Sequence, residues 1–150
     1  MTISTDRERS AARTRGAILD AAERLFAIQG YEATSLTEVG AAAGVSRGTP
    51  GYFFGSKVEL YRAVLERGLE RVRAAIRSGE ERALASGESP EVVLAGAVAE
   101  YFDFIISNPN FVRLMEWEAL SDGRHLREVP PHIEAAHEAV AAIGAELGLD

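Results

Sequence analysis

The first side chains that suggest chemistry lie in the run Gly44-Val45-Ser46-Arg47-Gly48. Its G-x-S-x-G spacing is that of a nucleophile elbow, in which a serine hydroxyl attacks a carbonyl carbon. Such an elbow needs a preceding strand that holds the serine at the edge of a parallel sheet. Here three alanines at positions 41–43 precede the run, and alanine favours a helix. We therefore expect neither a hydrolase nor any other enzyme.

The histidines form a second candidate group, because His125, His132 and His137 lie near Glu134 and Glu138. A metal site needs ligands that converge on one point, but His132 and His137 are five residues apart and face different sides of a helix. The chain has no cysteine, which excludes a disulfide, a thiolate metal site and a cysteine nucleophile. We expect surface histidines, no bound metal and no cofactor.

The elements that must position these side chains are predicted to be helices. No alternation of period two persists, whereas apolar residues recur at helical spacing from end to end, which predicts an all-α fold. Glycine, proline and serine mark where the helices end. The predicted breaks lie at Gly30, Gly44, Gly55-Ser56, residues 86–90, Asn108-Pro109, residues 121–123 and Pro130-Pro131, before a last helix from Ile133 to Leu147.

Several helix starts carry their own capping signals. Ser35 with Glu38, and Ser56 with Glu59, have the Ser-x-x-Glu spacing of a capping box, in which each residue bonds the backbone amide of the other. Pro90 follows a serine and suits the first position of the fifth predicted helix, where its missing N–H is not needed.

The net charge of −7 is unevenly distributed along the chain. Residues 1–57 carry a net charge of +1 and residues 58–150 carry −8. A near-neutral N-terminal part can approach phosphate while the acidic remainder is repelled by it. The N-terminus has no signal-peptide pattern and no segment approaches the ~18 apolar residues of a membrane span, so we expect a soluble cytoplasmic protein.

Two short helices joined at Gly44-Val45 within a three-helix cluster match the helix-turn-helix pattern. In that motif the first helix crosses the DNA backbone and the second enters the major groove. Val39, Ala43 and Val45 would hold the two helices at a steep angle, and Gly44 would supply the positive φ of the turn. The pattern predicts a DNA-binding motif over about residues 35–54.

These residues resemble the tetracycline-repressor (TetR/AcrR) family of bacterial regulators. The residues in combination make a specific match over roughly residues 13–65, and the match is looser over the rest of the chain, called here the body. The residues that carry it are 15–22, Leu25-Phe26, Gly30-Tyr31, 34–37, 43–49, Tyr52, Phe54, Lys57, Leu60 and, in the body, 108–114.

The resemblance implies how this region meets DNA. Ser35 and Thr37 would contact phosphate at the start of the second helix, where a helix N-terminus favours an anion. Arg47 is the first candidate for reading a base, because arginine bonds guanine through two parallel hydrogen bonds; the alternative is a solvated surface charge. The other implied contacts are Ser46, Gly48 and Thr49 at the groove, Tyr52 and Lys57 on the flanking backbone, and a mobile arm from Arg7 to Arg15.

Two positions depart from the family pattern, which usually has leucine and then tyrosine where this chain has Pro50 and Gly51. Proline is tolerated near a helix start, and Pro50 would stand at the first helical position if Thr49 were the N-cap. We expect a short, locally bent recognition helix. Without the usual tyrosine, Tyr52 and Phe53 must supply the remaining aromatic or hydroxyl contact.

The helical body is implied to hold a small-molecule effector between its helices. Tyr101, Met115, Trp117 and Glu118 are the candidate lining residues, although most aromatic side chains at helical spacing are core. The acidic side chain favours a cationic or hydrogen-bonding ligand.

We therefore expect a flexible basic arm over residues 1–12, a helix-turn-helix head over 13–60 and, joined by a long helix, an effector-binding and self-association body over 61–150. The family usually adds two long helices that form its dimer interface, so we expect a shortened member or fragment that is weakly dimeric or monomeric. The leading function is a sequence-specific, ligand-released repressor acting on double-stranded operator DNA. The alternative is a helical interaction module with lost or weak DNA binding.

Overall fold

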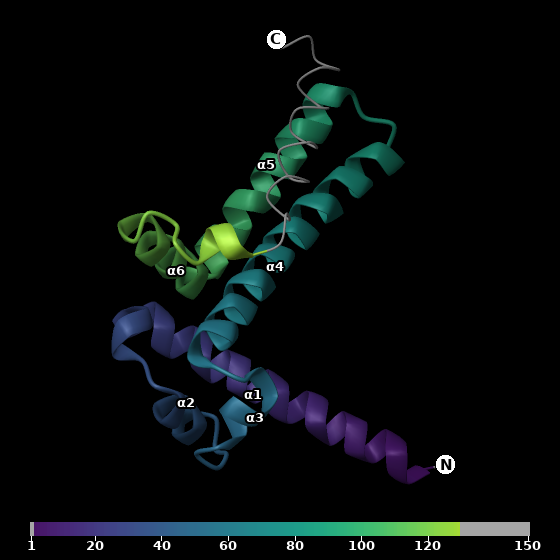
Figure 1. The fold of residues 1–150 in the computed structure, drawn as a ribbon. Coiled ribbons are helices and arrows are strands. Elements are labelled where there is room, and N and C mark those ends of the chain that lie inside the picture. Colours follow the sequence, from purple (N-terminus) through teal and green to yellow (C-terminus); the bar gives the residue numbers. More distant parts are fainter. Residues whose placement is uncertain (1, 130–150) are drawn as a thin grey trace. The chain divides into compact units, whose positions relative to one another are not determined.

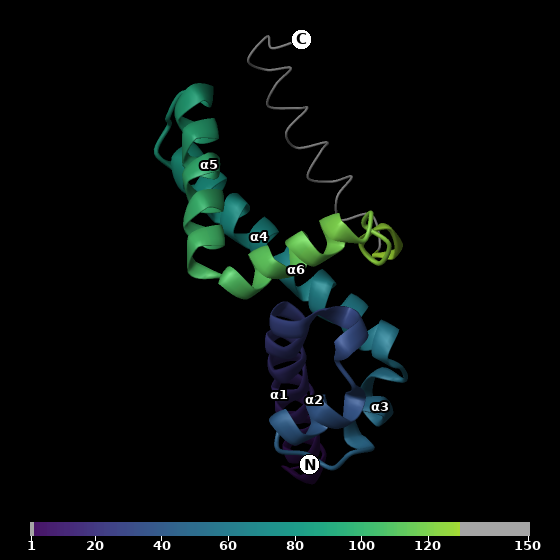
Figure 2. The same ribbon diagram turned by 90° about the vertical axis from the view of Figure 1, so that its left-hand side faces the viewer.

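The structure is a computed structural model that describes residues 2–129, with side chains from Thr5 onward. Within that range the chain is helical and has no strand, which confirms the predicted all-α class (Figures 1 and 2). The predicted last helix, residues 133–147, lies outside the described residues. The elements are α1 (Thr2–Ala33), α2 (Leu36–Ala42), α3 (Thr49–Phe54), α4 (Lys57–Ala85), α5 (Pro90–Ser107), α6 (Pro109–Leu120) and a short 3-10 helix, η1 (Leu126–Glu128).

The chain divides into two compact units, and the first of them is built from two separate stretches. Residues up to Leu65 combine with Asn110–Leu126, whereas Glu66–Pro109 and residues 127–129 belong to the second unit. Nearly all of α6 therefore belongs to the same unit as α1, α2 and α3.

Helix α1 is longer than the sequence pattern indicated. It begins at Thr2, so the described part of the segment expected as a mobile arm is helical, and residues 5–13 are exposed. Alanine, arginine and glutamate are frequent there, and these residues favour a helix even without packing. The predicted break occurs at Gly30, whose φ of 81° and ψ of 174° are not helical.

The core of the first unit follows the predicted spacing along α1. Ile18, Ala22 and Phe26 are fully buried at intervals of four residues. They pack with apolar side chains from the other helices of the same unit. These side chains are Val39 of α2, Leu60, Tyr61, Val64 and Leu65 of α4, and Phe111 and Leu114 of α6.

Helix α2 has the predicted capping box. The Ser35 hydroxyl accepts the amide of Glu38 at 3.2 Å, and the Ser35 amide donates to Glu38 Oε2 at 2.9 Å. Hydrogen bonds from the Ser35 hydroxyl and then the Ser35 amide lower the pKa of Glu38. The second predicted box is only half formed. Ser56 accepts the amide of Glu59, but the Glu59 carboxylate pairs with Arg62 at 2.6 Å.

Helix α3 is short, as predicted, but its first residues are placed differently. Gly48 is the N-cap, Thr49 is the first helical residue and Pro50 is the second, so Thr49 is not the cap. The Ser46 and Thr49 hydroxyl oxygens lie 2.6 Å apart, and the Thr49 amide donates to the Ser46 carbonyl at 3.0 Å. Because of these bonds, the helix begins at Thr49 and not at Pro50.

In the second unit, α5 runs back along α4 (Figures 1 and 2). Two glycines permit the close approach, because a Cβ on Gly79 would lie 3.1 Å from the Gly96 carbonyl oxygen. Arg82 of α4 forms an ion pair with Glu100 of α5. Among residues 2–129, no helix combines the length and the apolar character that crossing a bilayer requires.

Candidate DNA-binding face and the pocket beside helix α6

The turn between α2 and α3 presents Ser46, Arg47 and Gly48 to solvent. Gly44 has the predicted positive φ, 69°, which reverses the chain after α2. The amide of Val45 then donates to the Gly40 carbonyl at 2.9 Å and ties the turn to α2. The result is a short, hydrogen-bonded turn with an exposed arginine at its tip.

The aromatic side chains of α3 differ in exposure. Tyr52 is 85% exposed, and its ring meets the ring of Phe53 edge to face at a centroid distance of 5.5 Å. Phe54 is partly buried, and the Arg15 guanidinium lies 4.9 Å from its ring centroid. A Cβ on Gly51 would meet nothing within 4 Å, so the missing tyrosine leaves open space and Tyr52 is the accessible hydroxyl of this helix.

The two residues expected at the start of α2 have different environments. Thr37 is exposed, whereas the Ser35 hydroxyl already accepts the Glu38 amide and donates to Glu38 Oε2 at 2.7 Å. The serine therefore has a structural role as the helix cap, whatever it contacts besides.

Replacing Ser35 with alanine is expected to lower the free energy of unfolding by about 1 kcal/mol, because the Glu38 amide loses its acceptor. The pKa of Glu38 should then rise toward its ordinary value, since the hydroxyl that donates to its carboxylate is gone. Urea unfolding and an NMR titration of Glu38 measure the two effects. Thr37→Ala removes a hydroxyl from the same helix and serves as the control; equal losses for both variants would contradict the capping role.

Lys57, expected on the DNA backbone, contacts the end of α1. Its ammonium donates to the carbonyl oxygens of Tyr31 at 2.9 Å and Glu32 at 3.4 Å, and lies 4.3 Å from the Tyr31 ring centroid. Lysine has three N–H donors, so one remains for another acceptor. These contacts hold the last turn of α1, directly before the cap of α2.

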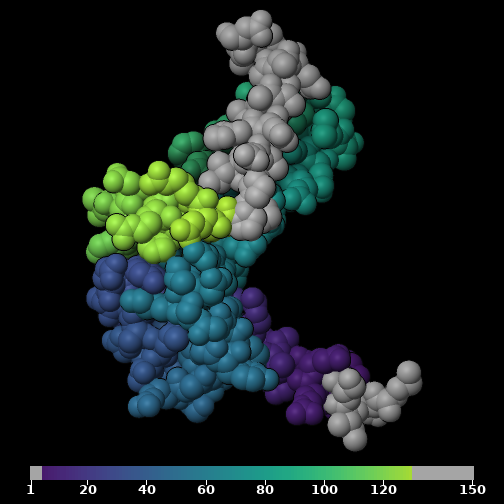
Figure 3. Space-filling model, viewed as in Figure 1, coloured from purple at the N-terminus to yellow at the C-terminus, as the bar shows by residue number. Residues whose placement is uncertain are grey.

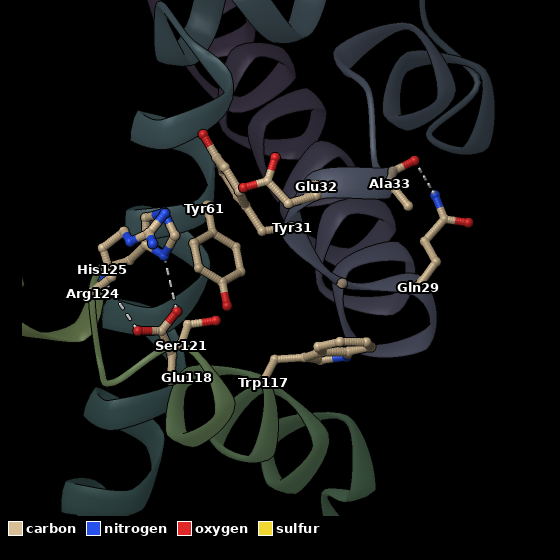
Figure 4. Close-up of a pocket in the computed structure, with 11 residues that line it drawn as sticks. Gln29, Tyr31, Glu32, Ala33, Tyr61, Trp117, Glu118, Ser121, Arg124 and His125 are labelled. Carbon is tan, nitrogen blue, oxygen red and sulfur yellow. Dashed lines mark hydrogen bonds and ion pairs between the residues drawn. The ribbon is translucent and has the colours of Figure 1, made fainter.

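A cavity of about 190 Å³ lies in the first unit beside the break in α1 (Figure 4). Of the four expected effector residues, the structure brings Trp117 and Glu118 to this cavity. Tyr101 lies on α5 in the second unit, and Met115 is half-buried on α6 away from the lining. The other lining residues are Gln29, Gly30, Tyr31, Glu32, Ala33, Tyr61, Ser121, Arg124 and His125.

Trp117 joins α6 to the break in α1. A Cβ on Gly30 would lie 3.3 Å from three atoms of the indole, so the ring packs directly on the glycine backbone. The indole N–H also donates to the Ala27 carbonyl at 3.1 Å. In Figure 3 the yellow-green surface of residues 110–126 adjoins the dark blue surface around residue 30.

Glu118 is the most buried acid of the described residues, with 2% of its surface exposed. Its Oε2 accepts the amides of His125 at 3.1 Å and Leu126 at 2.9 Å, and its Oε1 lies 3.1 Å from His125 Nδ1. Tyr61 of α4 lines the same cavity as Glu118. Burial, and then the charge of Glu118, raise the pKa of Tyr61.

Sequence reasoning missed Tyr61 and His125 as parts of this cluster. His125 is buried, its ring centroid lies 4.5 Å from that of Tyr31 and 4.9 Å from that of Tyr61, and it is not on the surface as expected. The turn at Asp122 and Gly123, both with positive φ, folds the chain back so that His125 reaches Glu118. Among the described residues, no group of three or more acidic or histidine side chains is arranged to hold a metal ion.

Both halves of the chain match known family models. Residues 18–64 match the model described as bacterial regulatory proteins, tetR family, and residues 90–147 match the tetracyclin repressor-like C-terminal domain. The transcriptional repressor NicS of Pseudomonas putida is 30% identical over 81% of this chain and 56% of its own length. The transcriptional activator FasR of Mycolicibacterium smegmatis is 34% identical over 84% of this chain and 56% of its own length. The chain thus spans a little over half the length of these curated relatives.

Solved structures share the fold. A TetR family regulator from Marinobacter aquaeolei superposes with a TM-score of 0.75 at 22% identity, over 93% of this chain and 72% of that one. The Thermus thermophilus repressor FadR, solved with lauroyl-CoA, is 28% identical with a TM-score of 0.54, over 91% of this chain and 70% of that one. The two family models, the relatives and the shared fold show that the chain belongs to the tetR family of bacterial regulatory proteins, which are transcription regulators and not enzymes.

Proposed function

We propose that this chain binds a specific double-stranded operator through its helix-turn-helix head and regulates transcription there. The observation that carries the proposal is the exposed turn at residues 46–48, which hydrogen bonds hold between α2 and α3. Arg47 at its tip reads a base, and Ser46, Gly48 and Thr49 lie beside it at the groove. The residues on the DNA backbone are Ser35, Thr37, Tyr52 and Lys57, and the Phe53 ring supplies an aromatic contact.

Pro50 and Gly51 are the residues that favour the alternative, a head that has lost DNA binding. The position of Pro50 as the second residue of α3 weakens that alternative, because the first amides of a helix have no partner within the helix. Gly51 removes one aromatic group, but Tyr52 remains accessible on the same helix.

Selection from a random duplex library tests the proposal directly. The 150-residue chain should enrich one sequence motif and bind it at least about 10³-fold more tightly than random duplex at the same salt concentration. Its affinity should fall as salt rises, since each neutralised phosphate releases counterions. Enrichment of no motif, together with equal binding to all duplexes, would show that the head is an interaction module. Sedimentation of the complex gives the number of copies bound.

A ligand-released repressor is the form of regulation that the contacts of α6 favour. Trp117 ties α6 to α1, and Glu118 bonds His125, whose ring packs on Tyr61 of α4, within the unit that carries the turn. The end of α1 leads directly to the cap of α2. A ligand that moves α6 would therefore disturb the head. The lauroyl-CoA complex of FadR makes an acyl-CoA the first compound to test. If it releases the selected duplex, the duplex must weaken its binding by the same factor.

A further inference from the structure

Three parts of the head meet at the backbone of Gly40. A Cβ on this residue would lie 3.2 Å from the Ser46 carbonyl oxygen, 3.4 Å from Pro50 Cγ and 3.5 Å from Pro50 Cδ. Gly40 is buried, and Pro50 is fully buried although it belongs to the short helix that follows the exposed turn. At the point where α2, the turn and α3 converge, a Cβ at position 40 would be crowded by the Ser46 carbonyl oxygen.

The same point controls where the turn lies. The Gly40 carbonyl accepts the amide of Val45 at 2.9 Å, and the Ser46 carbonyl accepts the amide of Thr49 at 3.0 Å. A group inserted at position 40 would press on the Ser46 carbonyl and move the residue that follows it. That residue is Arg47.

The rigid ring of Pro50 limits how the structure around Gly40 can adjust. The pyrrolidine ring holds φ near −65° and has no rotatable side-chain bonds that would carry its atoms away from Gly40. The leucine more usual at this position in the resembled pattern could change rotamer instead. As the second residue of α3, proline also loses no hydrogen bond within the helix.

We propose that Gly40 and Pro50 are a matched pair of positioning residues that determine how Arg47 projects toward DNA, and hence which base it reads. The glycine allows the close approach of the Ser46 carbonyl, and the rigid ring beside it limits how far the turn can shift. This proposal rests on the proposed function for its effect on DNA, but the pairing itself is a property of the free protein and is measurable without DNA.

The test is a double-mutant cycle of Gly40→Ala and Pro50→Ala in the full 150-residue chain. Gly40→Ala alone is expected to weaken binding to the duplex selected by the wild-type chain about tenfold, and to change the preferred base at one position. In the Pro50→Ala background the same change should weaken binding only about twofold, because without the rigid ring the turn that carries the Ser46 carbonyl can shift away from the methyl group. Gly51→Ala is the matched control, since a Cβ there meets nothing within 4 Å.

Urea unfolding of the same four proteins separates the two proposals. Gly40→Ala should lower the unfolding midpoint more in the wild-type background than in the Pro50→Ala background. Equal shifts in both backgrounds would overturn the pairing even if the chain binds an operator tightly. If the midpoint shifts differ between the two backgrounds but the chain enriches no duplex, the pairing of Gly40 and Pro50 stands and the proposed function is rejected. An effect of Gly51→Ala as large as that of Gly40→Ala on binding would overturn the claim that steric contact is the cause.

Discussion

Replacing Glu118 with alanine is expected to destabilise the protein by about 3 kcal/mol, because buried donors lose their acceptor. The amides of His125 and Leu126 both donate to this one carboxylate, which is almost completely buried. The chain has a single tryptophan, Trp117, next to Glu118. Its fluorescence during urea unfolding therefore reports on the region that the substitution affects.

Two variants make this measurement specific. Glu116→Ala removes an exposed carboxylate from the same helix and should change stability by less than about 0.5 kcal/mol. Glu118→Gln keeps one carbonyl oxygen as an acceptor, so its loss of stability should lie between those of Glu116→Ala and Glu118→Ala. A Glu118→Ala variant as stable as Glu116→Ala would show that the cluster does not hold α6 in place.

Replacing Arg47 with alanine is expected to weaken binding to the selected duplex by about 1–3 kcal/mol and to relax the preference at one base position. The reason is its exposed place at the tip of the turn between α2 and α3. Fluorescence anisotropy with the selected duplex and with single-base variants of it measures both effects. Random duplex should lose much less affinity, because that binding depends on phosphate contacts.

Lys57→Ala and Arg113→Ala are the comparison variants for Arg47→Ala. Lys57→Ala should weaken all duplexes alike, and it lowers the salt dependence by about one counterion if its ammonium also reaches a phosphate. Arg113 is an exposed arginine on α6, and its loss should leave the base preference unchanged. Equal losses on selected and random duplex for Arg47→Ala would mean that this residue is only a backbone contact.

The local features of the head were predictable because their causes lie within a few residues. The Ser35–Glu38 box spans three positions, Gly44 alone supplies the positive φ of its turn, and Gly30 ends the regular part of α1. The N-cap of α3 was predicted at Thr49 and lies at Gly48, since the Ser46–Thr49 hydroxyl pair shifts the start of the helix by one residue.

The cluster around Glu118 was not predictable from spacing. The indole N–H of Trp117 donates to a carbonyl ninety residues earlier in the chain, and the ring of Tyr61 meets that of His125 across more than sixty residues. No local pattern records such contacts, so His125 was expected on the surface. Of the predicted effector residues, Trp117 and Glu118 reached the cavity because they are neighbours on one helix, whereas Tyr101 belongs to the other unit.

The division of the first unit into two stretches has a consequence for synthesis on the ribosome. When Leu65 has emerged, the helices of the head are present, but Phe111 and Leu114, which complete their core, have not yet been translated. The nascent head must wait for residues 66–109 before it can close, and joining segments so far apart in sequence slows folding. During that interval the apolar side of α1 and α4 stays uncovered, which makes it a natural binding site for a chaperone.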